Sequence, residues 1–181
     1  MEADEMTLVV QGDVLVSDNP TAIFMTLLGS CVSACMYDSA ANVGGMNHFL
    51  LPAGNGYGSA DRISYGTHAM EKLINSLLNM GAKKSRLKCK LFGGANIRPQ
   101  FGNIGTQNSE FATEFLSAEG ITCTSSSTGG VLGRRVRFWP VGGRAQQALI
   151  RDETMPATEI KAAQDDILRI RMDRQHEVDF F

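Results

Sequence analysis

The chain has 181 residues, of which 43% are hydrophobic, and its 17 basic and 19 acidic side chains give a formal net charge of −2. This length and apolar content suit one folded domain and speak against a disordered chain. The near-balanced charge gives no reason to expect a nucleic-acid or anionic-membrane partner. We find no secretory signal, and no apolar run approaches the roughly 18 residues of a membrane span. We therefore expect a soluble, cytoplasmic protein without membrane insertion.

Short apolar or alternating runs predict strands through the first 150 residues. They cover residues 6–10, 22–28, 32–37, 43–51, 87–91, 121–125, 135–139 and 145–150. Glycine pairs at 93–94 and 129–130 match no phosphate-binding fingerprint, so we interpret both as turns. Many strands and few helices predict an α+β domain with a largely antiparallel sheet.

Two helices are predicted among these strands. The first carries one apolar stripe that ends before Gly81, formed by Met70, Leu73, Ile74, Leu77 and Leu78. The segment 53–62 before it is rich in glycine and polar residues and is interpreted as a loop. The second helix covers 109–118, with Asn108 or Ser109 as its N-cap and Gly120 at its end.

The composition changes after Arg151. We expect one domain over residues 1–151 and a separate, partly helical tail over 152–181 whose role is unknown. The amphipathic stretch 157–174 in this tail either docks on another protein or is a solvated helix.

Cysteine placement singles out one candidate nucleophile. Four unevenly spaced cysteines indicate neither a disulfide framework nor a zinc site, and Cys35, Cys89 and Cys123 lie inside alternating strands. Cys31 follows Gly29-Ser30, where a bend would expose its side chain and point backbone N–H groups at a developing oxyanion. The alternative is that Cys31 is a small buried apolar residue.

His48 is the natural base for this cysteine. It lies 17 residues after Cys31, beyond a turn between two strands that can pair side by side. A thiol needs a nearby base to supply thiolate at neutral pH, although a lone strand histidine is more often structural. An orienting third group is common in such pairs. We prefer Thr26 to Asn47, because Asn47 faces away from His48 in a regular strand.

The segments Leu28-Gly29-Ser30-Cys31-Val32 and Gly44-Gly45-Met46-Asn47-His48-Phe49, followed by Leu51-Pro52, resemble the signature of the CheD family of chemoreceptor glutamine deamidases. Further similar blocks lie at 90–95, 104–111 and 129–138, so the resemblance covers about residues 7–150. It implies a compact α/β sandwich like that of bacterial toxins that deamidate GTPases. Two positions depart from the family pattern, Gln107 and Ser127, and they put substrate or partner contacts in doubt.

The resemblance also implies an activity, which is hydrolysis of glutamine side-chain amides on methyl-accepting chemotaxis receptors with release of ammonia. Cys31 matches the nucleophile, His48 the base and Thr26 the third residue, while backbone N–H groups of Ser30 and Cys31 would hold the oxyanion. No metal or organic cofactor is implied. Two rival hypotheses stay open: a regulator that mainly binds a CheC-type phosphatase, and a different cysteine hydrolase such as a protease.

Overall fold

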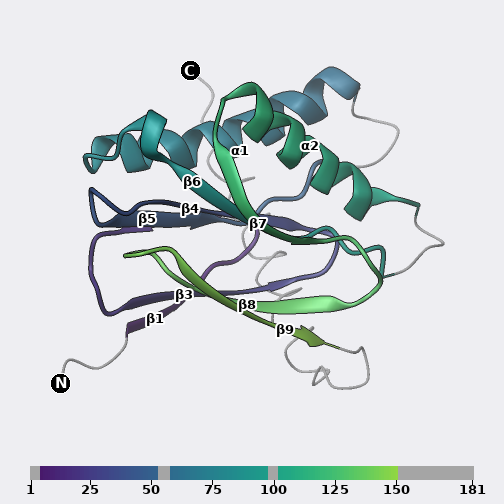
Figure 1. The fold of residues 1–181 in the computed structure, drawn as a ribbon. Coiled ribbons are helices and arrows are strands. Elements are labelled where there is room, and N and C mark those ends of the chain that lie inside the picture. Colours follow the sequence, from purple (N-terminus) through teal and green to yellow (C-terminus); the bar gives the residue numbers. More distant parts are fainter. Residues whose placement is uncertain (1–4, 53–57, 98–101, 151–181) are drawn as a thin grey trace, which may run out of the picture.

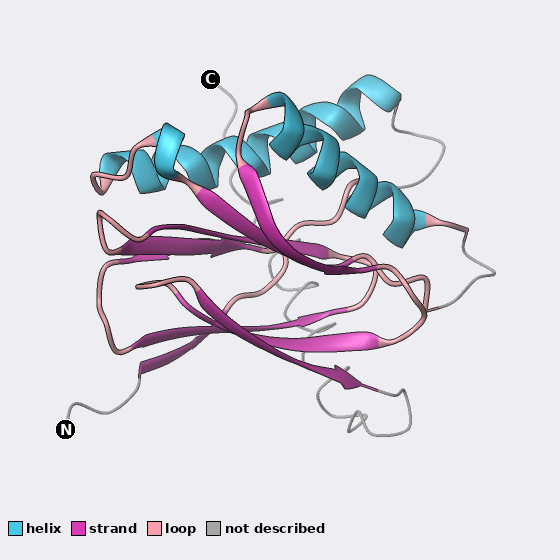
Figure 2. Ribbon diagram, in the orientation of Figure 1, coloured by secondary structure: helices cyan, strands magenta, loops and turns pink. Residues whose placement is uncertain are grey.

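The computed structural model describes residues 5–52, 58–97 and 102–150, and the tail predicted over 152–181 lies outside them. Over the described residues the chain forms three layers, with two α-helices on one face of a five-stranded sheet and a four-stranded sheet on its other face (Figure 1). Figure 2 shows the same layers with helices in cyan and strands in magenta. The predicted α+β fold is confirmed.

The five-stranded sheet contains, in spatial order, β2 (Val14–Ser17), β5 (Val43–Asn47), β4 (Val32–Asp38), β6 (Lys88–Gly93) and β7 (Thr122–Thr128). The four-stranded sheet contains β1 (Glu5–Leu8), β3 (Ala22–Leu28), β8 (Gly133–Trp139) and β9 (Arg144–Ile150). Only β1–β3 and β6–β7 pair in parallel among the described strands, so both sheets are largely antiparallel as predicted.

Both helices begin earlier than their apolar stripes indicate. Helix α1 covers Ser59–Asn79, and the carboxylate of Asp61 accepts the Gly58 N–H at 3.1 Å in its first turn. The interpretation of 53–62 as a loop is therefore wrong for residues 59–62. Helix α2 covers Ile104–Ala118 and so begins five residues before the predicted start at residue 109. A short 3-10 helix, η1 (Lys84–Arg86), precedes β6. The first turns of α1 and α2 carry no apolar residues at helical spacing, so the sequence pattern does not predict them.

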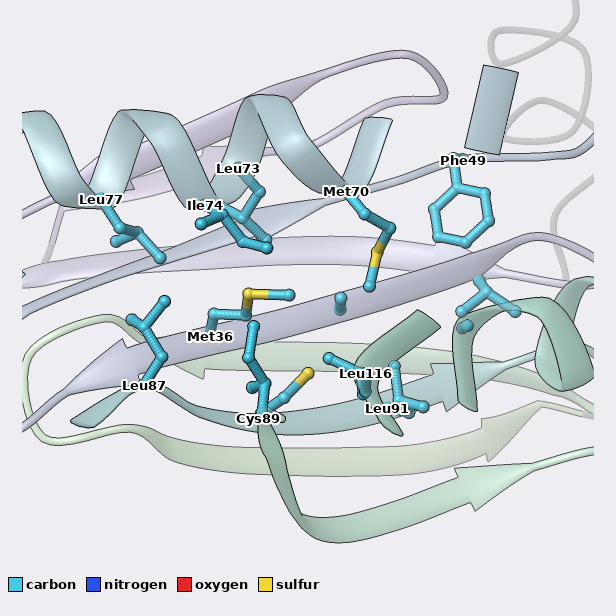
Figure 3. Packing of buried hydrophobic residues seen from close by; sticks show 14 of the residues in the cluster. Met36, Phe49, Met70, Leu73, Ile74, Leu77, Leu87, Cys89, Leu91 and Leu116 are labelled. Atoms are coloured by element: carbon cyan, nitrogen blue, oxygen red, sulfur yellow. The ribbon is translucent and has the colours of Figure 1, made fainter. Parts of the chain in front are cut away.

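The apolar stripe of α1 packs on the five-stranded sheet. Met70, Leu73 and Leu77 are fully buried and face Met36 of β4 and Leu91 of β6 (Figure 3). Burying a side chain of this size contributes about 1.5–3 kcal/mol relative to leaving it exposed. Gly81 ends the helix at φ +94°, a conformation that glycine adopts without a steric penalty.

Alternation along β4 separates this core from a second core between the sheets. Val32, Ala34 and Met36 belong to the cluster under the helices, whereas Cys35 and Tyr37 belong to the cluster between the sheets. The second cluster also contains Val9, Phe24, Leu28, Met46, Phe92, Val136 and Phe138, and Cys31 packs against it. The candidate nucleophile therefore faces the layer between the two sheets.

Neither helix in the described part of the chain has the length and apolarity that a membrane span requires.

Candidate active site

The pairing of β4 with β5 brings Cys31 and His48 to one face. The ladder pairs Cys35 with Met46, and Val32 and Phe49 continue the same register by exchanging two backbone hydrogen bonds of 2.9 Å. In this register Cys31 and His48 are diagonal neighbours, and side chains at diagonal positions of an antiparallel pair lie within reach of each other. Both follow the alternation that faces the layer between the sheets.

Thr26 fixes which nitrogen of His48 carries the proton. The Thr26 hydroxyl donates to the Val9 carbonyl oxygen at 2.7 Å and lies 2.9 Å from His48 Nδ1. Its single hydrogen is used on Val9, so the hydroxyl accepts from His48 and Nδ1 must be the protonated nitrogen. The Val9 oxygen lies 3.3 Å from the same Nδ1, which agrees with a donor there. His48 therefore keeps an unprotonated Nε2.

The Nε2 atom of His48 is buried and has no hydrogen-bond partner among the described residues. Burial lowers the pKa of His48, and this effect exceeds the opposing influences of the Val9 carbonyl and the Asp13 charge. Burial of the Cys31 thiol raises its pKa to about 12, with a smaller lowering by its own backbone N–H. Both directions favour the uncharged forms, a thiol at Cys31 and a neutral imidazole at His48 whose Nε2 can accept a proton.

The peptide groups around Cys31 are held from one side. The Gly29 carbonyl accepts the Ala95 N–H at 2.9 Å, and the Ser30 carbonyl accepts Asn108 Nδ2 at 2.8 Å. In a trans peptide the N–H points opposite to the carbonyl of the same peptide group. The N–H groups of Ser30 and Cys31 consequently point away from these partners, and the Cys31 N–H lies against its own thiol.

Two glycines let the β6–α2 connection approach Cys31 this closely. Gly94 N–H donates to the Cys31 carbonyl at 2.8 Å, and Gly93 and Gly94 have φ angles of +107° and +64°. A Cβ on Gly93 would overlap the Cys31 carbonyl oxygen, and one on Gly94 would overlap the Ser109 hydroxyl. The interpretation of 93–94 as a turn is wrong for Gly93, which is the last residue of β6, while Gly94 opens the connection to α2; both glycines support the backbone of Cys31.

Asn108 is not a helix cap, which corrects the sequence-based expectation. It lies inside α2 with no exposed surface, because its side chain bonds two backbone groups of the site. Nδ2 donates to the Ser30 carbonyl, and Oδ1 accepts the Leu51 N–H at 2.9 Å. One buried side chain therefore joins the backbone before Cys31 to the backbone after His48.

Asn47 points toward α1 and away from His48. Its Oδ1 accepts the Ala34 N–H at 2.8 Å, and its Nδ2 donates to the Ala69 carbonyl at 3.2 Å. The side chain replaces a backbone bond of the ladder, which explains why β5 ends at Asn47 instead of continuing to residue 51. Of the two polar candidates, Thr26 is the one that contacts His48.

Gln11 is a site residue that the sequence did not single out. It lies in the turn between β1 and β2, and the Cys31 thiol donates to its Oε1 at 3.6 Å. The only local signal is Gly12, which indicates a turn but says nothing of contact with a residue twenty positions away.

The two positions that depart from the family pattern make polar contacts of their own. Gln107 is exposed on α2 and accepts from Arg62 at 3.5 Å. The Ser127 hydroxyl accepts from Arg134 at 3.4 Å and from Gln147 at 2.9 Å. Neither contact involves Cys31 or His48.

Comparison with known proteins finds one family that this chain resembles over most of its length. Residues 50–148 match the family model described as CheD chemotactic sensory transduction. A protein of Cereibacter sphaeroides named probable chemoreceptor glutamine deamidase CheD is 48% identical over 154 residues, which cover 85% of this chain and 77% of that one. Proteins with the same name from Agrobacterium fabrum and Caulobacter vibrioides are 51% and 48% identical, over 77% and 82% of this chain and 77% and 80% of theirs.

Solved structures give a weaker likeness. Neisseria meningitidis protein NMB0706, of family DUF152, matches with a TM-score of 0.45 and 12% identity over 70% of this chain and 64% of that one. The expected likeness to GTPase-deamidating toxins stays a prediction. The matched family model covers more than half of the sequence, and the relatives match over most of their length. The chain belongs to the CheD family.

Proposed function

We infer that this protein is a cytoplasmic chemoreceptor glutamine deamidase that uses Cys31 as nucleophile and His48 as base. The observation that carries the inference is the buried Nε2 of His48, which has no partner in the described structure while Nδ1 is bonded to Thr26. A histidine with one nitrogen fixed and the other unpaired, within reach of a thiol on the same face of the sheet, is the arrangement that activates a cysteine nucleophile. The names of its relatives supply the substrate class, which is a glutamine side chain of a chemoreceptor.

The reaction proceeds in two halves. His48 Nε2 takes the thiol proton as Cys31 Sγ bonds to the carbonyl carbon of the substrate amide. The negative charge that forms on the amide oxygen is held by the N–H groups of Ser30 and Cys31. The carbon–nitrogen bond then breaks, and protonated His48 gives its proton to the departing ammonia.

The second half releases the product from a thioester. Water loses a proton to His48 and attacks the thioester carbon, and the carbon–sulfur bond breaks to leave a glutamate side chain. The proton on His48 returns to Cys31. Thr26 keeps His48 in the tautomer that both halves need, because its hydroxyl accepts from Nδ1. It contacts no substrate atom and acts by orienting the base.

The experiment is incubation of the purified protein with a receptor signalling domain that keeps its encoded glutamines. Ammonia release and an amide-to-acid change in the intact mass of the receptor are expected, and Cys31→Ala abolishes both. Receptor fragments in place of an intact chain would indicate a protease instead. No reaction with several receptors, together with capture of a CheC-type phosphatase by wild type and Cys31→Ala alike, would favour the regulator over the enzyme.

A further inference from the structure

Gln11 lies in a turn that is fixed to the backbone of His48. Asp13 N–H donates to the Val10 carbonyl at 3.0 Å, and Gly12 between them has a φ of +96°, which places Gln11 at the second position of the turn. Gly12 N–H donates to the His48 carbonyl at 2.8 Å, and His48 N–H donates to the Asp13 carbonyl at 3.1 Å. The base and the Gln11 backbone therefore hold a constant position relative to each other.

From this turn the carboxamide of Gln11 reaches the nucleophile. The Cys31 thiol donates to Oε1 at 3.6 Å, which is a hydrogen-bond distance for sulfur. A carboxamide carries an acceptor and a donor on one carbon, and rotation about its last bond exchanges them. The oxygen suits the neutral thiol of the resting site. After attack the negative charge lies on the substrate oxygen two bonds from the sulfur, and there the nitrogen is the suitable end.

We propose that Gln11 is a catalytic residue whose Nε2–H donates a hydrogen bond to the oxyanion, beside the N–H groups of Ser30 and Cys31. The proposal rests on the function inferred above, because that reaction creates the oxyanion. As the sulfur–carbon bond forms, the carbonyl π electrons move to the oxygen, which accepts the hydrogen bond. Gln11 keeps both of its amide protons throughout. When the electrons return, the carbon–nitrogen bond breaks and ammonia leaves with the proton from His48.

The N–H groups of Ser30 and Cys31 alone would give the oxyanion two donors, both from one side of Cys31. The Ser30 and Cys31 peptides are held by the β6–α2 connection and by α2, whereas Gln11 comes from the β1–β2 turn. The turn that carries Gln11 is fixed before charge develops, so only the carboxamide has to rotate to bring its donor to the oxyanion, and a donor held near its final position is the condition under which an oxyanion hole is effective.

Two variants test the donor directly. Gln11→Ala removes it, and Gln11→Glu keeps the shape while an ionised carboxylate cannot donate. Loss of one oxyanion donor costs about 100- to 1,000-fold in kcat, so we expect a fall of that order in ammonia release from receptor for both. Gln146→Ala, the same change at an exposed glutamine of β9, should keep wild-type activity. Thermal unfolding of each variant controls for folding.

Two small reagents separate the oxyanion from the thiol. Acylation of Cys31 by p-nitrophenyl acetate passes through a tetrahedral oxyanion, whereas alkylation by iodoacetamide displaces iodide and forms none. Gln11→Ala should therefore lower the acylation rate by about the same factor as kcat, at about 100-fold or more, and leave alkylation near wild type. Equal losses with both reagents, or no loss with either, would overturn the proposal. So would an active Gln11→Glu.

The reagents also work without a receptor. If wild type releases no ammonia from any receptor, yet acylation falls relative to alkylation in Gln11→Ala, the inferred function fails and the role of Gln11 stands. A different overturning outcome is a stored wild-type protein in which Gln11 itself becomes glutamate while Cys31→Ala keeps glutamine. Gln11 would then be a substrate of the thiol and not a donor.

Discussion

Replacement of Thr26 by valine tests the hydrogen bond that orients His48. Valine has a volume similar to that of threonine but lacks the hydroxyl, so two bonds disappear, one donated to the Val9 carbonyl and one accepted from His48 Nδ1. Thr26 has no exposed surface, so solvent cannot supply a substitute from outside the core. The Val9 oxygen still lies 3.3 Å from Nδ1 and offers the imidazole a weaker partner.

The two bonds have different importance for stability and for catalysis. A neutral buried bond contributes about 1 kcal/mol, so Thr26→Val should lower the free energy of unfolding by about 1–3 kcal/mol. In the transition state His48 is protonated, and a bond to a charged donor contributes about 1.5–3 kcal/mol. Only the excess over the neutral state accelerates the reaction. An excess of about 0.5–2 kcal/mol corresponds to a fall in kcat of about 2- to 30-fold.

The assay measures kcat for ammonia release from receptor across pH, with Thr26→Ser as the matched control that keeps the hydroxyl. Loss of the acceptor should lower the pKa of His48 further below its ordinary value, so the acid limb of the profile moves to lower pH in the valine variant. Serine should retain most of the activity. A valine variant with wild-type kcat, or a serine variant as impaired as valine, would refute the orienting role.

Three further predictions concern Asn108, the Asp38–Arg86 ion pair and the ionisation of Cys31. Asn108→Leu leaves the Ser30 carbonyl and the Leu51 N–H unpaired, and each unpaired group should lower the free energy of unfolding by about 1–3 kcal/mol. The control is Leu116→Ala, a buried change in the same helix with a comparable cost in chemical denaturation, and kcat should fall by more in Asn108→Leu than in this control. The Arg86 guanidinium lowers the pKa of Asp38 from 3.8 to about 2, so the stability from this pair is present above about pH 3.8 and is lost as pH falls toward 2; denaturation of Asp38→Asn should show a flatter decline there. Alkylation of Cys31 should still accelerate above pH 9, because burial raises its pKa to about 12, and a plateau below pH 9 would contradict this.

Periodic side chains made much of the fold predictable. The alternation in residues 32–37 and the apolar stripe of 70–78 each reflect a face that packs on a core, so β4 and the body of α1 follow from sequence. The first turns of both helices and the short strand β2 lack such a pattern. β2 has only partly buried residues and exists because it pairs with β5 at the edge of the sheet.

The surroundings of the candidate nucleophile depend on contacts that no local pattern contains. Asparagine is a common helix-capping residue, so the sequence suggests Asn108 as a cap. It lies one turn inside α2 instead, because the helix begins at Ile104. Its partners Ser30 and Leu51 are 78 and 57 positions away. Gln11 reaches Cys31 only because the turn that carries it is bonded to His48. Tertiary packing decides both contacts.

Cys31 and His48 are both uncharged in the resting site, and this explains why so many hydrogen-bonding groups surround them. Burial opposes the thiolate of Cys31 and the imidazolium of His48 alike, so separated charges are unfavourable in the empty site. In the proposed reaction the negative charge forms on the amide oxygen, where the N–H groups of Ser30 and Cys31, held by Asn108 and the β6–α2 connection, would donate to it. The positive charge stays on His48, where Thr26 and the Val9 carbonyl accept from Nδ1. In the proposed mechanism the acceptors of His48 are already in place and the oxyanion alone gains its donors along the reaction path, which favours attack on a bound amide over reaction of the thiol with solvent oxidants or small electrophiles.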